Sequence, residues 1–285
     1  MMAALTLCVR SSPVAGVRAG HGGFNGLEPY IAPVAFVVSA EAYDRFMGRY
    51  SLPLAPLFAD FAGVGFGQRV LDVGCGPGAL TTELVRRLGT TAVAAADPSP
   101  SFVTAFGERH PGVEVRQADA EHLPFEDESF DAALAQLVVH FMGDPVAGLR
   151  ELRRVTRRRG VVAACVWDHG GGGGPLNLFW EAVRDLDPHA EGEAGLAGAR
   201  QGHLAQLLDD AGLREVEADT LSITVEHGSF DEWWEPFTLG VGPAGAYVSR
   251  LDDEGQARLR ERCRSHLPPG PFTVSARAWA GRGLV

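Results

Sequence analysis

The hydrophobic positions between residues 68 and 167 repeat one order. A short apolar run is followed by a turn, then by an amphipathic helical segment, then by another apolar run. Alternation of this kind predicts βαβ units, in which a parallel sheet is covered by helices on both faces. The runs that we expect to form strands are Arg69–Val73, Ala92–Ala96, Val113–Gln117, Ala132–Gln136 and Val161–Trp167.

The segments between these runs have helix signals. The first carries one apolar stripe, which includes Leu80, Leu84 and Leu88. The helix before the fifth run is expected to begin at Asp144-Pro145, where a capping carboxylate precedes a proline at the first helical position. The pattern therefore predicts helices of ordinary length that each bury one face.

Further elements follow the fifth run. We expect helices near residues 176–186 and 203–211, and strands near residues 215–225 and 273–280. The segment between those two strands, residues 229–267, is rich in tryptophan and proline and is interpreted as an inserted cap. Residues 1–38 have no lasting period and are interpreted as a disordered tail. The fold class is thus a doubly wound α/β domain over residues 39–285.

Composition and charge narrow the possible partners. Apolar residues make up 46% of the 285 positions and charged residues 21%, which is the balance of a folded protein. The net charge of −11 disfavours a nucleic-acid partner, because such binding depends on basic side chains. The basic cluster at Arg153, Arg154 and residues 157–159 is interpreted as the end of a helix. Oligomeric state is not indicated.

Cysteine positions and hydropathy indicate the cellular compartment in which we expect the protein. The four cysteines are far apart and form no CxxC pair, so neither a metal site nor a disulfide framework is predicted. No apolar run approaches the roughly 20 residues that span a bilayer. We therefore expect a cytoplasmic protein without a membrane span.

A glycine-rich turn follows the first predicted strand. Residues 70–78 read Val-Leu-Asp-Val-Gly-Cys-Gly-Pro-Gly, so that Gly74, Gly76 and Gly78 stand where a strand gives way to a helix. Glycines there allow a ligand to approach the backbone. The same spacing also satisfies the G-x-G-x-x-G/A pattern of dinucleotide binders, and the loop alone leaves both cofactors open.

Three carboxylates stand near the ends of successive strands. Asp72 precedes the glycines, where it would repel a pyrophosphate but not a ligand with an ammonium and a sulfonium group. Asp97 can accept hydrogen bonds from both ribose hydroxyls, and Asp119 can accept one from an adenine amino group. Together they predict an elongated nucleoside site along the carboxyl edge of the sheet.

These motifs resemble one known family. The glycine loop, the Asp97-Pro98-Ser99 segment, and residues 119–125 leading into Ser129-Phe130-Asp131 are similar to the class I methyltransferases of the type 11 group, near the ubiquinone and menaquinone biosynthesis enzymes. The similarity covers residues 43–168. It implies a mostly parallel seven-stranded sheet with an antiparallel last pair, and S-adenosylmethionine as a methyl donor that is converted to S-adenosylhomocysteine.

The resemblance also implies site residues. Residues 43–50 are similar to the helix that closes over the cofactor, and Arg49 is a candidate for the methionine carboxylate. Cys75 is interpreted as a small packing residue. The predicted cofactor-binding positions are Tyr43, Arg49, Asp72, Gly74, Cys75, Gly76, Gly78, Asp97, Pro98, Asp119, Ala120 and Gln136, with no metal ligand.

The methyl acceptor is predicted only as a small molecule. His140 is the candidate general base, although the family often has paired histidines here and this chain has Val-His-Phe. The aromatic side chains of the expected cap either form an apolar wall for the acceptor or fill the core, and they are Trp233, Trp234, Phe237 and Tyr247. Three other functions stay open: an NAD(P)-dependent Rossmann oxidoreductase, a non-catalytic S-adenosylmethionine-binding protein, and an aminopropyl transferase.

Overall fold

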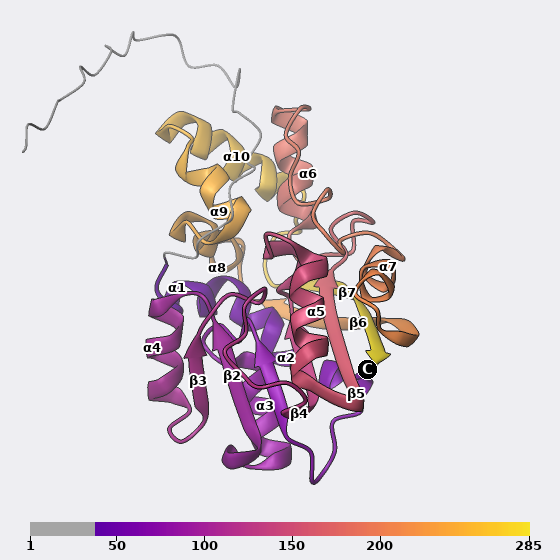
Figure 1. Ribbon diagram of the computed structural model, residues 1–285. Helices are drawn as coiled ribbons and strands as arrows, with labels where there is room; N and C mark the ends of the chain where they lie inside the picture. The colour runs from indigo at the N-terminus through magenta and orange to yellow at the C-terminus, as the bar shows by residue number, and fades with distance from the viewer. Residues whose placement is uncertain (1–37) are drawn as a thin grey trace, which may run out of the picture. The chain divides into compact units, whose positions relative to one another are not determined.

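A computed structural model describes residues 38–285 and contains one seven-stranded sheet (Figure 1). The strand order is β3-β2-β1-β4-β5-β7-β6, with β1 to β5 parallel and β7 antiparallel to both of its neighbours. The doubly wound fold and the antiparallel last pair are confirmed. The strands are β1 Val70–Val73, β2 Val93–Asp97, β3 Glu114–Gln117, β4 Phe130–Gln136, β5 Thr156–Trp167, β6 Arg214–His227 and β7 Phe272–Leu284.

Helices connect the strands and precede the first of them. Among the expected helices, those near residues 176–186 and 203–211 form, and Asp144 caps its helix by accepting a hydrogen bond from the Ala147 amide. The helical segments are α1 Ala40–Tyr43, η1 Asp44–Gly48, α2 Arg49–Phe61, α3 Ala79–Leu88, η2 Thr90–Ala92, α4 Pro100–Arg109, η3 Val139–Phe141, α5 Pro145–Val155, α6 Asn177–Leu186, α7 His203–Asp210, α8 Phe230–Trp234, η4 Glu235–Leu239, α9 Gly242–Ser249 and α10 Asp253–Ser265.

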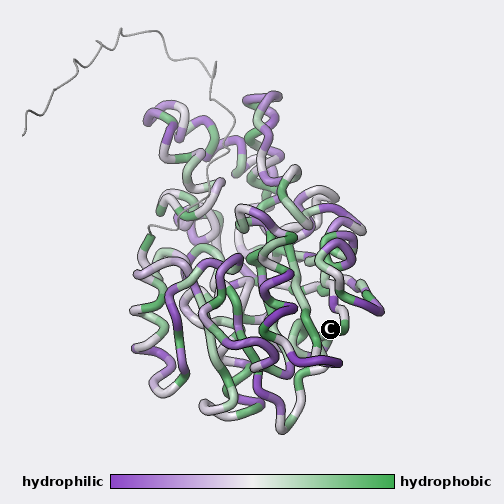
Figure 2. Tube along the Cα trace, viewed as in Figure 1, coloured by the Kyte–Doolittle hydropathy of each residue, from purple (hydrophilic) through white to green (hydrophobic). Residues whose placement is uncertain are grey.

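The sheet has a hydrophobic cluster on each face. Val70 belongs to the cluster that includes α2 and α3, and the next residue, Leu71, belongs to the cluster that includes α5 and α7. Successive strand residues point to opposite faces, so a strand covered on both sides must be apolar throughout. Figure 2 shows this as green along the inner strands. Double burial explains why the inner strands could be predicted as continuous apolar runs.

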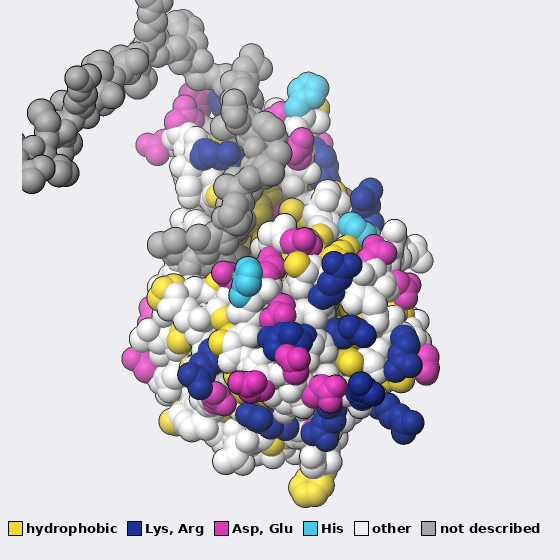
Figure 3. All heavy atoms as spheres, in the orientation of Figure 1, with side chains coloured by type: hydrophobic (Ala, Val, Ile, Leu, Met, Phe, Trp, Pro, Cys, Tyr) yellow, Lys and Arg dark blue, Asp and Glu magenta, His cyan; other side chains and the backbone are white. Residues whose placement is uncertain are grey.

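The basic cluster differs from the expectation. Helix α5 ends at Val155, and residues 157–159 lie at the start of β5, which is five residues longer at its beginning than predicted. Ion pairs hold the first two arginines, Arg157 with Asp131 and Arg158 with Glu128. On the face drawn in Figure 3, basic and acidic side chains are intermixed.

Helices α8, η4, α9 and α10 occupy the stretch between β6 and β7 where a cap was expected. The four aromatic side chains singled out in this stretch are all buried and belong to the hydrophobic cluster shared with α2 and α3. Phe237, for example, stacks on Phe179 of α6 with ring centroids 4.5 Å apart. The structure therefore favours core filling for these aromatics. Residues 1–37 lie outside the described part of the chain.

Asp168 ties the end of β5 to β7. Its side chain is fully buried, and its Oδ1 accepts hydrogen bonds from the Gly171 amide at 2.7 Å and the Trp279 indole at 3.0 Å. The Arg277 guanidinium donates to Oδ2 through both Nε and Nη2. A buried carboxylate that accepts this many hydrogen bonds fixes the positions of its donors. The glycine-rich residues 170–174 are thus folded around one side chain.

Replacing Asp168 by Ala should destabilise the fold by about 2–4 kcal/mol, because the indole and amide donors would lose their acceptor. Urea denaturation provides the measurement. Asp209→Ala, which removes an exposed carboxylate from α7, is the matched control and should change the free energy of unfolding by less than about 0.5 kcal/mol. Equal effects of the two substitutions would show that Asp168 does not organise this end of the sheet.

Candidate active site

Two connected cavities lie at the carboxyl ends of β1, β2 and β4. One has a volume of about 830 Å³ and the other about 560 Å³, and Tyr43, Gly74 and Gln136 line both. The neighbours of β1 are β2 and β4, so the strand order reverses at β1, and ligands of doubly wound sheets bind at such a position. Of the predicted cofactor-binding positions, all but Arg49 line one cavity or the other.

The glycine loop is fixed to the end of β2. The amides of Gly74 and Cys75 both donate to the Ala96 carbonyl oxygen, at 2.7 and 3.1 Å. Gly74 has a φ of +68°, and a Cβ added there would lie 2.4 Å from Val138. Only glycine combines this backbone conformation with this close approach. The loop thus packs against the segment after β4 while leaving its own backbone open to the cavity.

Asp72 and Asp97 are buried on either side of this loop. The Thr81 hydroxyl donates to Asp72 at 2.6 Å, and the amides of Gly76 and Ser99 donate to Asp97 at 2.8 and 2.9 Å. Burial raises the pKa of Asp72 to about 7 and that of Asp97 to about 6, and the charge of Asp97 adds to the shift at Asp72. A cationic ligand would stabilise the ionised form of both carboxylates.

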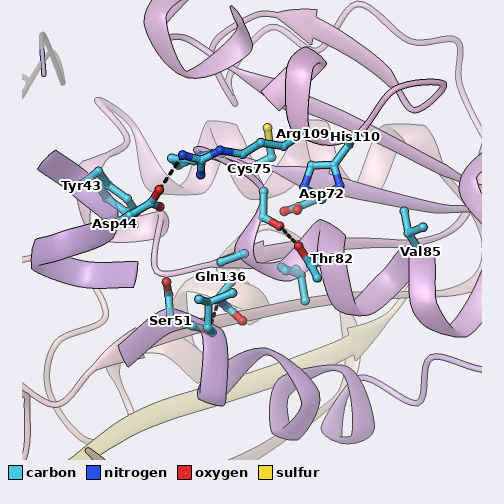
Figure 4. A pocket seen from close by; sticks show the side chains of 16 residues that line it. Tyr43, Asp44, Ser51, Asp72, Cys75, Thr82, Val85, Arg109, His110 and Gln136 are labelled. Atoms are coloured by element: carbon cyan, nitrogen blue, oxygen red, sulfur yellow. Dashed lines mark hydrogen bonds and ion pairs between the residues drawn. The ribbon is translucent and has the colours of Figure 1, made fainter. Parts of the chain in front are cut away.

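Gln136 at the end of β4 presents an unpartnered oxygen. Its Nε2 donates to the Ser51 carbonyl oxygen of α2 at 3.1 Å, and among the described residues its buried Oε1 has no hydrogen-bond partner. Figure 4 shows Gln136 and Ser51 on one side of the smaller cavity, with Asp72 and Tyr43 also on its lining. A buried acceptor without a donor is costly, so this oxygen suits a ligand that supplies an N–H group.

The side chain of Arg49 does not reach the two cavities. Its Nη1 lies 2.9 Å from Nδ1 of His227 and 3.4 Å from the Glu232 carboxylate, and it lines neither cavity. These partners belong to the end of β6 and to α8, which are distant from Arg49 in the sequence. The predicted contact with the methionine carboxylate therefore has no support in the geometry. Arg109, which was not predicted, lines the smaller cavity and pairs with Asp44 at 2.6 Å (Figure 4).

The larger cavity continues over the segment after β3. Asp119 and Ala120 line it, as predicted from the sequence, and Asp119 is exposed. Apolar side chains that the sequence analysis did not single out complete this part of the wall, among them Phe102, Val138 and Met142. Phe102 occupies an ordinary apolar position of α4, so no sequence signal marked it. The mixture of acidic side chains, Asp119 and Glu121, with apolar walls suits a flat heteroaromatic ring.

A small third cavity, about 30 Å³, lies beside the first two. Tyr43 and Leu137 connect its lining to theirs, and His140 lines it as well. His140 is buried, its Nδ1 has no partner among the described residues, and burial lowers its pKa well below the usual range. The ring is therefore neutral at physiological pH. His169 and Glu193 share this cavity and were missed by the sequence analysis, because only the fold brings them together.

Sequence comparison gives the family. A family model described as a methyltransferase domain matches residues 71–164, from β1 into β5. An uncharacterized protein of Mycobacterium tuberculosis, Rv1403c, is 30% identical over 76% of this chain and 82% of its own length. This chain belongs to the methyltransferase family. The resemblance seen in the sequence is thereby confirmed, and the oxidoreductase alternative is not favoured.

Two further similarities concern one curated protein and one solved structure. A probable phthiotriol/phenolphthiotriol dimycocerosates methyltransferase of Mycobacterium ulcerans is 34% identical over 54% of this chain, and the match spans about half, 52%, of that protein. The solved phosphoethanolamine N-methyltransferase 2 of Haemonchus contortus, in complex with S-adenosylhomocysteine, has a TM-score of 0.53 at 15% identity, covering 86% of this chain and 56% of its own. The latter shows a shared fold.

Cofactor binding should depend on pH because of the two buried carboxyl groups. In the free protein, Asp72 and Asp97 hold protons below pKa values of about 7 and 6. A ligand with an ammonium and a sulfonium group favours the ionised forms, so its binding releases protons. Affinity for S-adenosylmethionine should therefore rise with pH up to about 7 and level off above it.

Calorimetry at several pH values provides the measurement, and Asp72→Asn is the matched variant. This substitution should flatten the upper part of the rise, since only Asp97 would still titrate. An affinity that falls or stays constant between pH of about 5 and 7 would contradict the account.

Proposed function

We propose that the protein transfers a methyl group from S-adenosylmethionine to a small-molecule acceptor. The proposal rests on the hydrogen-bond acceptors that line the connected cavities. They are two buried carboxylates and one unpartnered amide oxygen, all next to the glycine loop. An adenosyl cofactor with an ammonium, a sulfonium and two ribose hydroxyls matches that lining. S-adenosylmethionine supplies an electrophilic methyl group when bound.

The residues present fit this cofactor. Asp97 lines the larger cavity and keeps lone pairs for the ribose hydroxyls in addition to the two amides that it binds. Asp72 and the Gln136 oxygen line the smaller cavity, where they would hold the ammonium. The apolar walls near Ala120 and Phe102 would enclose the adenine.

The acceptor is proposed to bind in the region of the third cavity, which Tyr43 and Leu137 separate from the larger cavity. His140 there is neutral and offers an unpartnered nitrogen to a group that donates a hydrogen bond. Methyl transfer needs alignment of the two reactants more than it needs a catalytic triad. His140 would thus orient the acceptor nucleophile, and its lowered pKa makes it a weak base.

Calorimetry with three ligands tests this proposal. S-adenosylmethionine and S-adenosylhomocysteine should bind and NAD should not. Asp97→Ala should weaken binding of both adenosyl ligands at least tenfold, since a hydrogen bond to a charged group contributes about 1.5–3 kcal/mol. The melting temperature serves as the check on folding. Tight binding of NAD, or an unchanged dissociation constant in the variant, would refute the proposal.

A further inference from the structure

The third cavity contains a buried carboxylate that the cofactor site does not use. Glu193 is 4% exposed, and its Oε2 accepts a hydrogen bond from the Trp180 indole at 2.7 Å. Among the described residues, Glu193 has no ion pair with a basic side chain. Burying a carboxylate without a cation is unfavourable. A ligand with a positive charge would relieve that cost.

The surroundings of Glu193 are aromatic and apolar. Phe46, Phe141 and Trp167 line the same cavity, together with the neutral ring of His140. Aromatic faces attract cations, and combined with a carboxylate they form a site that favours an ammonium group over a neutral hydroxyl. Trp167 has its indole N–H directed at the Met47 sulfur, 3.3 Å away, so this N–H group does not compete for the carboxylate.

The cavity lies on the acceptor side of the cofactor site. Tyr43 and Leu137 belong to its lining and to that of the large cavity, so the two volumes share a wall. On its other side, His169 and Glu193 also line a narrower cavity that reaches Asn177 and Arg184 of α6. The volume of about 30 Å³ accommodates one water-sized group, which is the size of an ammonium head. A larger ligand body needs one wall of this cavity to open, and residues 241–243 at the start of α9 form one such wall.

We propose that the methyl acceptor is a small primary amine whose ammonium group is bound by Glu193. This inference rests on the proposed methyl transfer and specifies its substrate class. The ammonium donates to the Glu193 carboxylate, and His140 accepts from a second N–H. Before the nitrogen can act as a nucleophile, one proton passes from it to the Glu193 carboxylate, which leaves a neutral amine and a neutral acid.

Benzylamine and benzyl alcohol are a matched pair of probes, because they differ mainly in charge. With the protein saturated by S-adenosylhomocysteine, calorimetry should show that benzylamine binds at least tenfold more tightly than benzyl alcohol. One charged hydrogen bond accounts for this ratio. Glu193→Gln should reduce the preference to about threefold or less, since the amide oxygen still accepts from Trp180 while the charge is lost.

Glu191→Gln is the matched control, since it removes an exposed carboxylate two residues away and should leave the preference unchanged. An unchanged melting temperature in Glu193→Gln would separate recognition from folding. The inference is overturned if wild type binds both probes equally, if Glu193→Gln keeps the preference, or if neither probe binds at about 10 mM. In each case, intact binding of S-adenosylhomocysteine would leave the proposed methyl transfer standing.

Discussion

Two carboxylates, Asp72 and Asp97, are buried at the carboxyl ends of adjacent parallel strands, with a glycine loop between them. Burial weakens the hydration of their charges, so the protein relies on the Thr81 hydroxyl and on backbone amides, and their pKa values remain raised. This arrangement costs stability in the free protein, and a cationic ligand would offset that cost. The architecture around it can be understood as the means of holding these two side chains in place.

The sheet holds them because the strand order reverses at β1. Helices α3 and α4 start from the carboxyl ends of β1 and β2, so their first turns and the preceding loops surround the same space. The antiparallel strand β7 extends the sheet beyond β5, and Asp168 joins it to the glycine-rich residues after β5. Those residues lead to α6 and Glu193. One continuous framework thus positions both the two cavities beside the glycine loop and the third cavity.

The sequence predicted those parts of this framework that have a short-range pattern of apolar, glycine and acidic residues. Inner strands covered on both faces are continuous apolar runs, and a strand that ends in glycines beside an acid has a recognisable pattern. Most strands therefore lie where they were expected, and the singled-out residues from Asp72 to Asp119 line the two cavities. The start of β5 was missed because its three arginines break the apolar pattern, and two of them, Arg157 and Arg158, pair with residues 131 and 128. Arg49, His169 and Glu193 depend on contacts between distant segments, which no local pattern encodes.

We propose that these carboxylates bind an adenosyl cofactor at the reversal of strand order. A crystal structure of the protein with S-adenosylhomocysteine would show whether they do. We expect both ribose hydroxyl oxygens within hydrogen-bond distance of the Asp97 carboxylate, and the amino group of the ligand near Asp72 and the Gln136 oxygen. A ligand bound away from the glycine loop, or with its ribose turned from Asp97, would contradict the proposal.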